Sequence, residues 1–171
     1  LFFANKNGNT IERMRLMKLL WLSDRLHLNK YGRLILKDRY KALPNGPIAS
    51  TALNISNHGI PNSIRVDKFN VISKKDFDAD FFSKSDIKIM EYVWTKFNTM
   101  QSFDFSDYSH KYPEWLRYEK ELNSEFTPNA YDIVIQDFFE FPELSEFADL
   151  LDEETISLSK EDFNVKNSIQ G

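Results

Sequence analysis

The 171-residue sequence contains no cysteine and only five glycines. The absence of cysteine excludes disulfide bridges, cysteine-ligated zinc sites and thiol chemistry. With so few glycines there is no glycine-rich phosphate loop, and neither G-x-G-x-x-G, G-x-S-x-G nor H-E-x-x-H occurs. No apolar run approaches the roughly 20 residues of a transmembrane helix, and no secretory leader is visible. We therefore expect a cytoplasmic protein without membrane contact.

Charge is unevenly distributed along the chain, although the formal net charge is only −4. Residues 1–41 carry ten basic and three acidic side chains, a net of +7, whereas residues 137–171 carry two basic and ten acidic ones, a net of −8. Such asymmetry is typical of a segment that contacts a charged partner. It is equally compatible with two chain ends that pack against each other, and the sequence leaves both alternatives open.

Apolar spacing and capping residues predict a mainly α-helical domain, α+β in class, with six to eight helices and a small antiparallel β-sheet. We expect a long central helix at 10–30, capped by Asn9 and ended by Gly32 in a left-handed conformation. Ser83 and Asp86 have the spacing of a capping box. Further helices are predicted at 48–57, 83–98, 102–110 (capped by Asp104 or Ser106), 113–122, 131–139 and 142–151.

The predicted sheet consists of residues 39–43 and 63–73, paired antiparallel, with Pro44–Pro47 as a tight turn. Thr127-Pro128-Asn129 predicts a break, and residues from 152 onward are expected to be loosely ordered. We expect a domain at 1–122, followed by an acidic helical extension at 123–171 that packs on or follows the same domain.

No group of side chains supports an enzyme. His110 follows Asp107 by three residues, which suits a general base, but a structural hydrogen bond explains the same spacing. Alternating carboxylates at 76, 78 and 80 lack the glycine and the closing glutamate of a calcium loop. The remaining histidines, His27 and His58, are far apart. We expect no catalytic residue, no metal and no cofactor.

One region has a more specific pattern. Residues 17–28 read M-K-L-L-W-L-S-D-R-L-H-L, and Asn45-Gly46-Pro47-Ile48, Ser83-Lys84-Ser85-Asp86 and Ser109-His110 with Trp115 follow in order. With these spacings, residues 13–118 resemble the Panacea domain of the SocA-like antitoxin family. That family has a K-L-L-Y-L-A-D helix, a G-P-V turn, an L-S-x-x-D helix start and an S-H…W segment. Here a tryptophan, a serine and an isoleucine replace the usual Tyr, Ala and Val: Trp21, Ser23 and Ile48.

The resemblance implies a small cytoplasmic protein of a bacterium or phage, encoded beside a toxin that it neutralises by direct protein–protein contact. One alternative is a proteolytic adaptor that delivers the toxin to a AAA+ protease. Another is a DNA-binding transcriptional regulator, which the positive residues 1–41 favour and the negative overall charge disfavours. Family members accompany unrelated toxins, so the resemblance does not identify the toxin's chemistry.

Two sets of residues are predicted for the functional site. Large aromatic and arginine side chains dominate protein interfaces, so we expect the toxin to contact Arg39, Tyr40, Trp115 and Tyr118, with core packing as the alternative for Tyr40 and Trp115. The family motif residues expected to be structural are Asp24, Gly32, Gly46, Pro47 and His110. The acidic segment 142–151 is a second predicted contact, suited to a basic cleft on the toxin.

Overall fold

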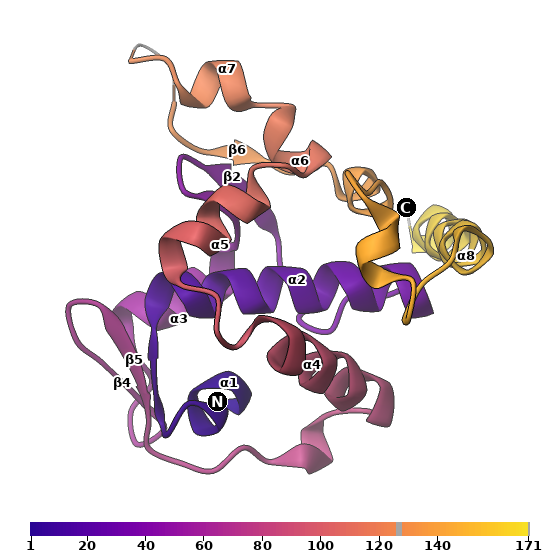
Figure 1. Ribbon diagram of the computed structural model, residues 1–171. Coiled ribbons are helices and arrows are strands. Elements are labelled where there is room, and N and C mark those ends of the chain that lie inside the picture. Colours follow the sequence, from indigo (N-terminus) through magenta and orange to yellow (C-terminus); the bar gives the residue numbers. More distant parts are fainter. Residues whose placement is uncertain (126–127, 171) are drawn as a thin grey trace.

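The computed structural model describes residues 1–125 and 128–170 (Figure 1). Within them the α-helices are α1 (Phe2–Lys6), α2 (Arg13–Tyr31), α3 (Ser50–His58), α4 (Lys84–Phe97), α5 (Ser102–Ser109), α6 (Pro113–Leu116), α7 (Glu119–Leu122) and α8 (Glu153–Gln170). The strands are β1 (Thr10–Glu12), β2 (Tyr40–Leu43), β3 (Gly46–Ala49), β4 (Ile64–Val66), β5 (Asn70–Ser73) and β6 (Tyr131–Asp132). Three 3-10 helices complete the list: η1 (Ala79–Phe81), η2 (Ile135–Phe139) and η3 (Leu144–Phe147). The predicted mainly helical α+β fold is confirmed.

Helix α2 forms the centre of the fold, and α4, α5, α8 and β3 pack around it (Figure 1). It is buried on most of its circumference. Its polar side chains Lys18 and Asp24 are as inaccessible to solvent as Leu19 and Leu22. The helix ends at Gly32, which has a φ of 65° and donates its N–H to the carbonyl of Leu28. The predicted left-handed cap is therefore confirmed.

The predicted start of the central helix at residue 10 was wrong. Residues 10–12 form strand β1, which buries Ile11 and pairs it with Val71. Asn9 has a φ of 70° and does not cap the helix; Glu12 occupies the N-cap position. Strand pairing therefore overrides the local capping pattern at this position.

The six strands form two three-stranded antiparallel sheets, in the orders β1–β5–β4 and β3–β2–β6. The predicted pairing of 63–73 with 39–43 was wrong, because 63–73 itself forms the β4–β5 hairpin and β2 pairs with β3 and β6. Strands β2 and β3 pair across Pro44 and Asn45, so that Pro47 lies in a strand. Short loops cost little closure entropy, which favours such local pairing.

Several helix predictions are confirmed. Helix α4 begins with the predicted reciprocal capping box of Ser83 and Asp86, and α3 and α5 lie within two residues of their predicted bounds. The N-cap of α5 is Gln101, not Asp104 or Ser106. The helix predicted at 113–122 is divided into α6, with Pro113 in its first turn, and α7.

The C-terminal predictions were largely wrong. Residues 131–139 form β6 and η2, and residues 142–151 contain only the short η3. Residues after 152, expected to be loosely ordered, form the 18-residue helix α8, which packs on α2. Phe139 and Phe163 anchor it, with ring centroids 5.7 Å apart. The predicted break at Thr127 lies partly outside the described residues.

The two oppositely charged ends of the chain contact each other. Arg25 donates to the carbonyl oxygens of Asp137, at 3.4 Å, and Glu140, and Lys30 donates to the carbonyl oxygen of Leu150 at 2.6 Å. These three contacts join basic side chains to main-chain carbonyls and not to acidic side chains. None of the helices in residues 1–125 and 128–170 is long and apolar enough to cross a membrane.

Candidate partner-binding face and the motif residues beneath it

Lys18, from the K-L-L segment of α2, contacts the β2–β3 hairpin from below. Its Nζ donates to the carbonyl of Pro47 at 3.1 Å, and the residue is only 1% exposed. Burial lowers the pKa of Lys18 to about 7. Gly46 has a φ of 100°, and a Cβ there would overlap Lys18 Nζ and Ser109 Oγ. Only glycine therefore lets the hairpin approach the helix this closely.

Asp24 lies further along α2, and its carboxylate holds both the segment after α2 and the start of β2. Its carboxylate accepts hydrogen bonds from the N–H groups of Ile35 (2.6 Å) and Leu36 (3.0 Å) and from the hydroxyl of Tyr40 (2.8 Å). Burial raises the pKa of Asp24 to about 6, against the opposing effect of these hydrogen bonds. Asp24 thus fixes the segment after α2 and the start of β2.

The S-H…W segment holds the same hairpin, with Ser109 and Lys18 both lying next to Gly46. The rings of His110 and Trp115 stack, with centroids 3.7 Å apart and an interplanar angle of 15°. Trp115 Nε1 donates to the carbonyl of Leu43 at 2.8 Å. Burial lowers the pKa of His110, and the charge of Lys18 lowers it further. Its Nε2 is buried without a hydrogen-bond partner among the described residues.

A buried ion pair that the sequence pattern did not identify lies next to these residues. Glu114 and Arg25 are both inaccessible, and Arg25 Nη1 donates to both carboxylate oxygens at 2.8 Å. Trp21 Nε1 donates to the same carboxylate at 2.9 Å. Trp21 and Arg25 are one helical turn apart on α2, the only sequence signal that could have suggested a shared acidic partner.

The predicted partner contacts divide into buried and accessible residues. Tyr40 and Trp115 are 2% and 4% exposed, which agrees with the packing alternative for both. Arg39 is exposed, and Tyr118 is half-buried, its ring stacked on Tyr131 with centroids 5.1 Å apart. The Tyr118 hydroxyl donates to the carbonyl of Asp132 at 2.7 Å. Arg39 and Tyr118 therefore remain predicted contacts.

The accessible residues lie in one region of the surface, on or next to β2, β6 and α6, elements at the upper end of Figure 1. Within this region Lys41 and Asp132 are on one side of the sheet, and Tyr131 is on the other side with Ala42. Lys41 and Asp132 form an ion pair of 2.9 Å across it, and Arg39 lies near enough to lower the pKa of Asp132 in addition to Lys41. Apolar side chains, 46% and 40% exposed, extend it at Leu116 and Val134. We call this the β2–β6 face: Arg39, Lys41, Leu116, Tyr118, Tyr131, Asp132 and Val134.

The lowered pKa of Lys18 predicts a pH-dependent stability. Because the folded pKa of about 7 lies below the unfolded value of 10.5, unfolding takes up a proton between these values, and stability rises with pH. We expect the free energy of unfolding to increase between pH 7.5 and 9.5 by up to about 1.4 kcal/mol per pH unit. Urea unfolding of the wild type and Lys18→Met measures this; the variant should lose the slope, and equal slopes would contradict the assignment.

Comparison with known protein families identifies the family of this chain. The family model described as "Antitoxin SocA-like, Panacea domain" matches residues 16–116, more than half of the chain and a range that includes Lys18, Asp24, Gly46, His110 and Trp115. No curated protein and no solved structure matches. The match confirms the resemblance that the motifs indicated, and its range includes the residues that secure the β2–β3 hairpin.

Proposed function

The chain belongs to the SocA-like Panacea antitoxin family, and on this premise we propose that it is a cytoplasmic antitoxin that neutralises its cognate toxin by direct binding, without catalysis, metal or cofactor. The family match over residues 16–116 carries the proposal. The position of the motif residues supports it, because they rigidify a hairpin whose outer side belongs to an accessible face with aromatic, apolar and charged side chains.

We propose the β2–β6 face as the toxin-binding surface. A stable interface buries roughly 1,200–2,000 Å² in total, and a few tyrosine, tryptophan and arginine side chains supply most of its binding energy. The Tyr118–Tyr131 stack is held in place by the Tyr118 hydroxyl bond, so little side-chain entropy is left to lose on binding. Arg39 forms no ion pair with the described residues, which leaves its charge available to a carboxylate of the toxin.

The basic side chains of α2 do not support DNA binding by this helix. Lys18 and Arg25 are buried. Arg13 donates to the carbonyls of Ser56, Asp67 and Lys68, and Arg15 donates to that of Asn98. These cations are therefore engaged inside the fold and are not free to neutralise phosphates. Direct binding of a protein partner, the function proposed from the family match, does not require these cations.

The proposal predicts that the protein rescues growth when co-expressed with the product of the adjacent open reading frame and co-purifies with it. Arg39→Ala and Tyr118→Ala are each expected to weaken toxin binding at least tenfold, about 1.4 kcal/mol, by calorimetric titration. Tyr118→Phe keeps the ring but loses the hydroxyl bond to Asp132, so it should weaken binding less than Tyr118→Ala. Lys88→Ala, on an exposed part of α4, is the control and should bind like the wild type.

The outcomes separate the parts of this proposal. If the wild type neither binds nor neutralises the neighbouring product, the antitoxin function is refuted. If all variants neutralise like the wild type, the β2–β6 face is the wrong surface. Measuring the toxin's half-life in cells distinguishes occlusion, which leaves it unchanged, from delivery to a AAA+ protease, which shortens it.

A further inference from the structure

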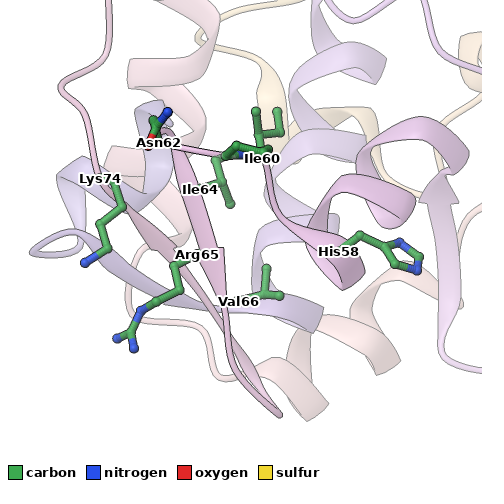
Figure 2. Close-up of a pocket in the computed structure, with 8 residues that line it drawn as sticks. His58, Ile60, Asn62, Ile64, Arg65, Val66 and Lys74 are labelled. Atoms are coloured by element: carbon green, nitrogen blue, oxygen red, sulfur yellow. The ribbon is translucent and has the colours of Figure 1, made fainter.

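An open groove of about 660 Å³ lies between β4 and the end of α3 (Figure 2). None of the residues that line it carries a carboxylate, in a chain whose net charge is negative. Arg65 and Lys74 are exposed and form no ion pair with the residues that the structure describes. The groove is lined by His58, Ile60, Pro61, Asn62, Ile64, Arg65, Val66 and Lys74.

Strand β4 is the outer strand of its sheet and has an unused main-chain edge. The N–H of Lys74 donates to the carbonyl of Ser63, and the N–H of Asp67 donates to the carbonyl of Asn70. In this register the odd-numbered residues of β4 form the hydrogen bonds to β5. Even-numbered residues therefore direct their N–H and C=O groups away from β5. Ile64 exchanges both bonds with Ile60, which leaves the main-chain groups of Val66 without a partner among the described residues.

Gly59 shapes the wall opposite this edge. Its φ is 74°, and a Cβ would lie 2.5 Å from the carbonyl oxygen of Ile64. Glycine therefore lets the segment after α3 approach β4 and form the Ile60–Ile64 bridge. The bridge closes the groove at one end, and the free edge begins at Val66.

The two faces of β4 differ in chemistry. Arg65 and Lys74 project from one face of the hairpin, as Figure 2 shows, because Arg65 is paired with Ile72 and Lys74 follows Ile72 by two residues. Ile64 and Val66 project from the other face, on the side of Ile60. Asp67, the nearest carboxylate along the strand, is turned into its own loop and accepts the N–H groups of Phe69 and Asn70. A strand added beside Val66 would thus meet cations on one face and aliphatic side chains on the other.

We propose that this groove binds an extended protein segment of alternating acidic and apolar residues, which adds as a strand to the free edge of β4. Its main chain exchanges hydrogen bonds with Val66, its acidic side chains pair with Arg65 and Lys74, and its apolar side chains pack on Val66 and Ile60. A nucleic acid would use the cations but neither the main-chain edge nor the aliphatic side chains, so the observations favour a peptide.

The site is independent of the β2–β6 face. In Figure 1 the β4–β5 hairpin lies beside α1, whereas β6 and α7 lie at the opposite, upper end. The test below needs no toxin, so its failure leaves the proposed antitoxin function unaffected.

The probe is a fluorescein-labelled, terminally blocked hexapeptide with three Asp-Val repeats, titrated into the full-length protein by fluorescence anisotropy at low salt. Two comparison peptides carry Lys-Val repeats or N-methylated valines, and oligothymidylate represents nucleic acid. We expect the Asp-Val peptide to bind the wild type. The double variant Arg65→Glu, Lys74→Glu should bind this peptide at least tenfold more weakly, and Lys88→Glu should bind it with unchanged affinity. N-methylation, which removes donors to the β4 edge without altering the protein, should also weaken it at least tenfold.

Other results would overturn the proposal. Equal binding of the Asp-Val and Lys-Val peptides, or undiminished binding of the N-methylated peptide, would exclude recognition by charge or by strand addition. Binding of oligothymidylate that is lost in the double variant, with no binding of the Asp-Val peptide, would identify a nucleic-acid contact instead. Circular dichroism of the double variant verifies that the exposed substitutions leave the fold intact.

Discussion

Replacing Glu114 with alanine is expected to lower the free energy of unfolding by about 3–5 kcal/mol, because it leaves the charge of Arg25 buried and unpaired. Both side chains are fully inaccessible, and the carboxylate also accepts the indole N–H of Trp21. The variant therefore loses two hydrogen bonds to Arg25 and one to Trp21. Urea unfolding at pH 7 and 25 °C measures the effect.

Two further variants test the cause of this loss. Glu119→Ala removes an exposed glutamate of α7 and should change stability by less than about 0.5 kcal/mol. Adding Arg25→Met to Glu114→Ala removes the unpaired charge and should restore part of the stability. A loss below about 1 kcal/mol in the single variant would mean that the carbonyl of Glu140 and the rings of Tyr112 and Phe141 suffice to hold the guanidinium.

Gly46→Ala is expected to lower the free energy of unfolding strongly. The φ of 100° strains an L-residue by about 1–2 kcal/mol, and the added methyl would overlap the buried Lys18 ammonium and the Ser109 hydroxyl, at a further cost of about 1–3 kcal/mol. Because Lys18 and Ser109 are themselves enclosed, neither can move aside freely. The β2–β3 hairpin should detach from α2, which chemical denaturation and amide hydrogen exchange at β3 would detect.

Gly8→Ala is the matched control for this substitution. Gly8 also has a positive φ, 69°, but a Cβ there meets nothing within 4 Å. It should therefore show the conformational strain alone. If both variants lose the same stability, the close approach of the hairpin to Lys18 does not contribute.

The parts of the fold that the sequence predicted are those with strong local signals. Helix α4 has a capping box and an amphipathic pattern, and α2 has a glycine at its end, so both were placed closely. Strands β1 and β6 are three and two residues long and exist only because a distant strand pairs with them. No local pattern encodes such a partner.

Helix α8 was missed because its stability comes from tertiary contact. It exposes Leu158, Val165 and Ile169 and buries Ser159, so apolar and polar residues do not separate into inner and outer faces. Packing on α2 compensates for this weak pattern. The sequence likewise gave no indication that Glu114 is buried, since a glutamate after a helix-initiating proline is usually solvated.

The motifs identified their residues as a group, but they did not predict that the residues all contact the β2–β3 hairpin. The motifs identified Lys18, Asp24, Gly46 and His110 as family positions, but only the fold shows that they converge on one hairpin. The predicted anchors Tyr40 and Trp115 belong to the same buried arrangement. Residue type alone does not distinguish an aromatic anchor from a core ring.

The carbonyl groups that receive Arg25, Asn29 and Lys30 belong to residues 137–150, beyond the end of the family match. Exchanging the last third of the chain for an unrelated sequence would leave the buried donors of Arg25 and Asn29 without these acceptors. The segment beyond the family match and helix α2 therefore form one packed unit, and replacing the former is expected to destabilise the latter.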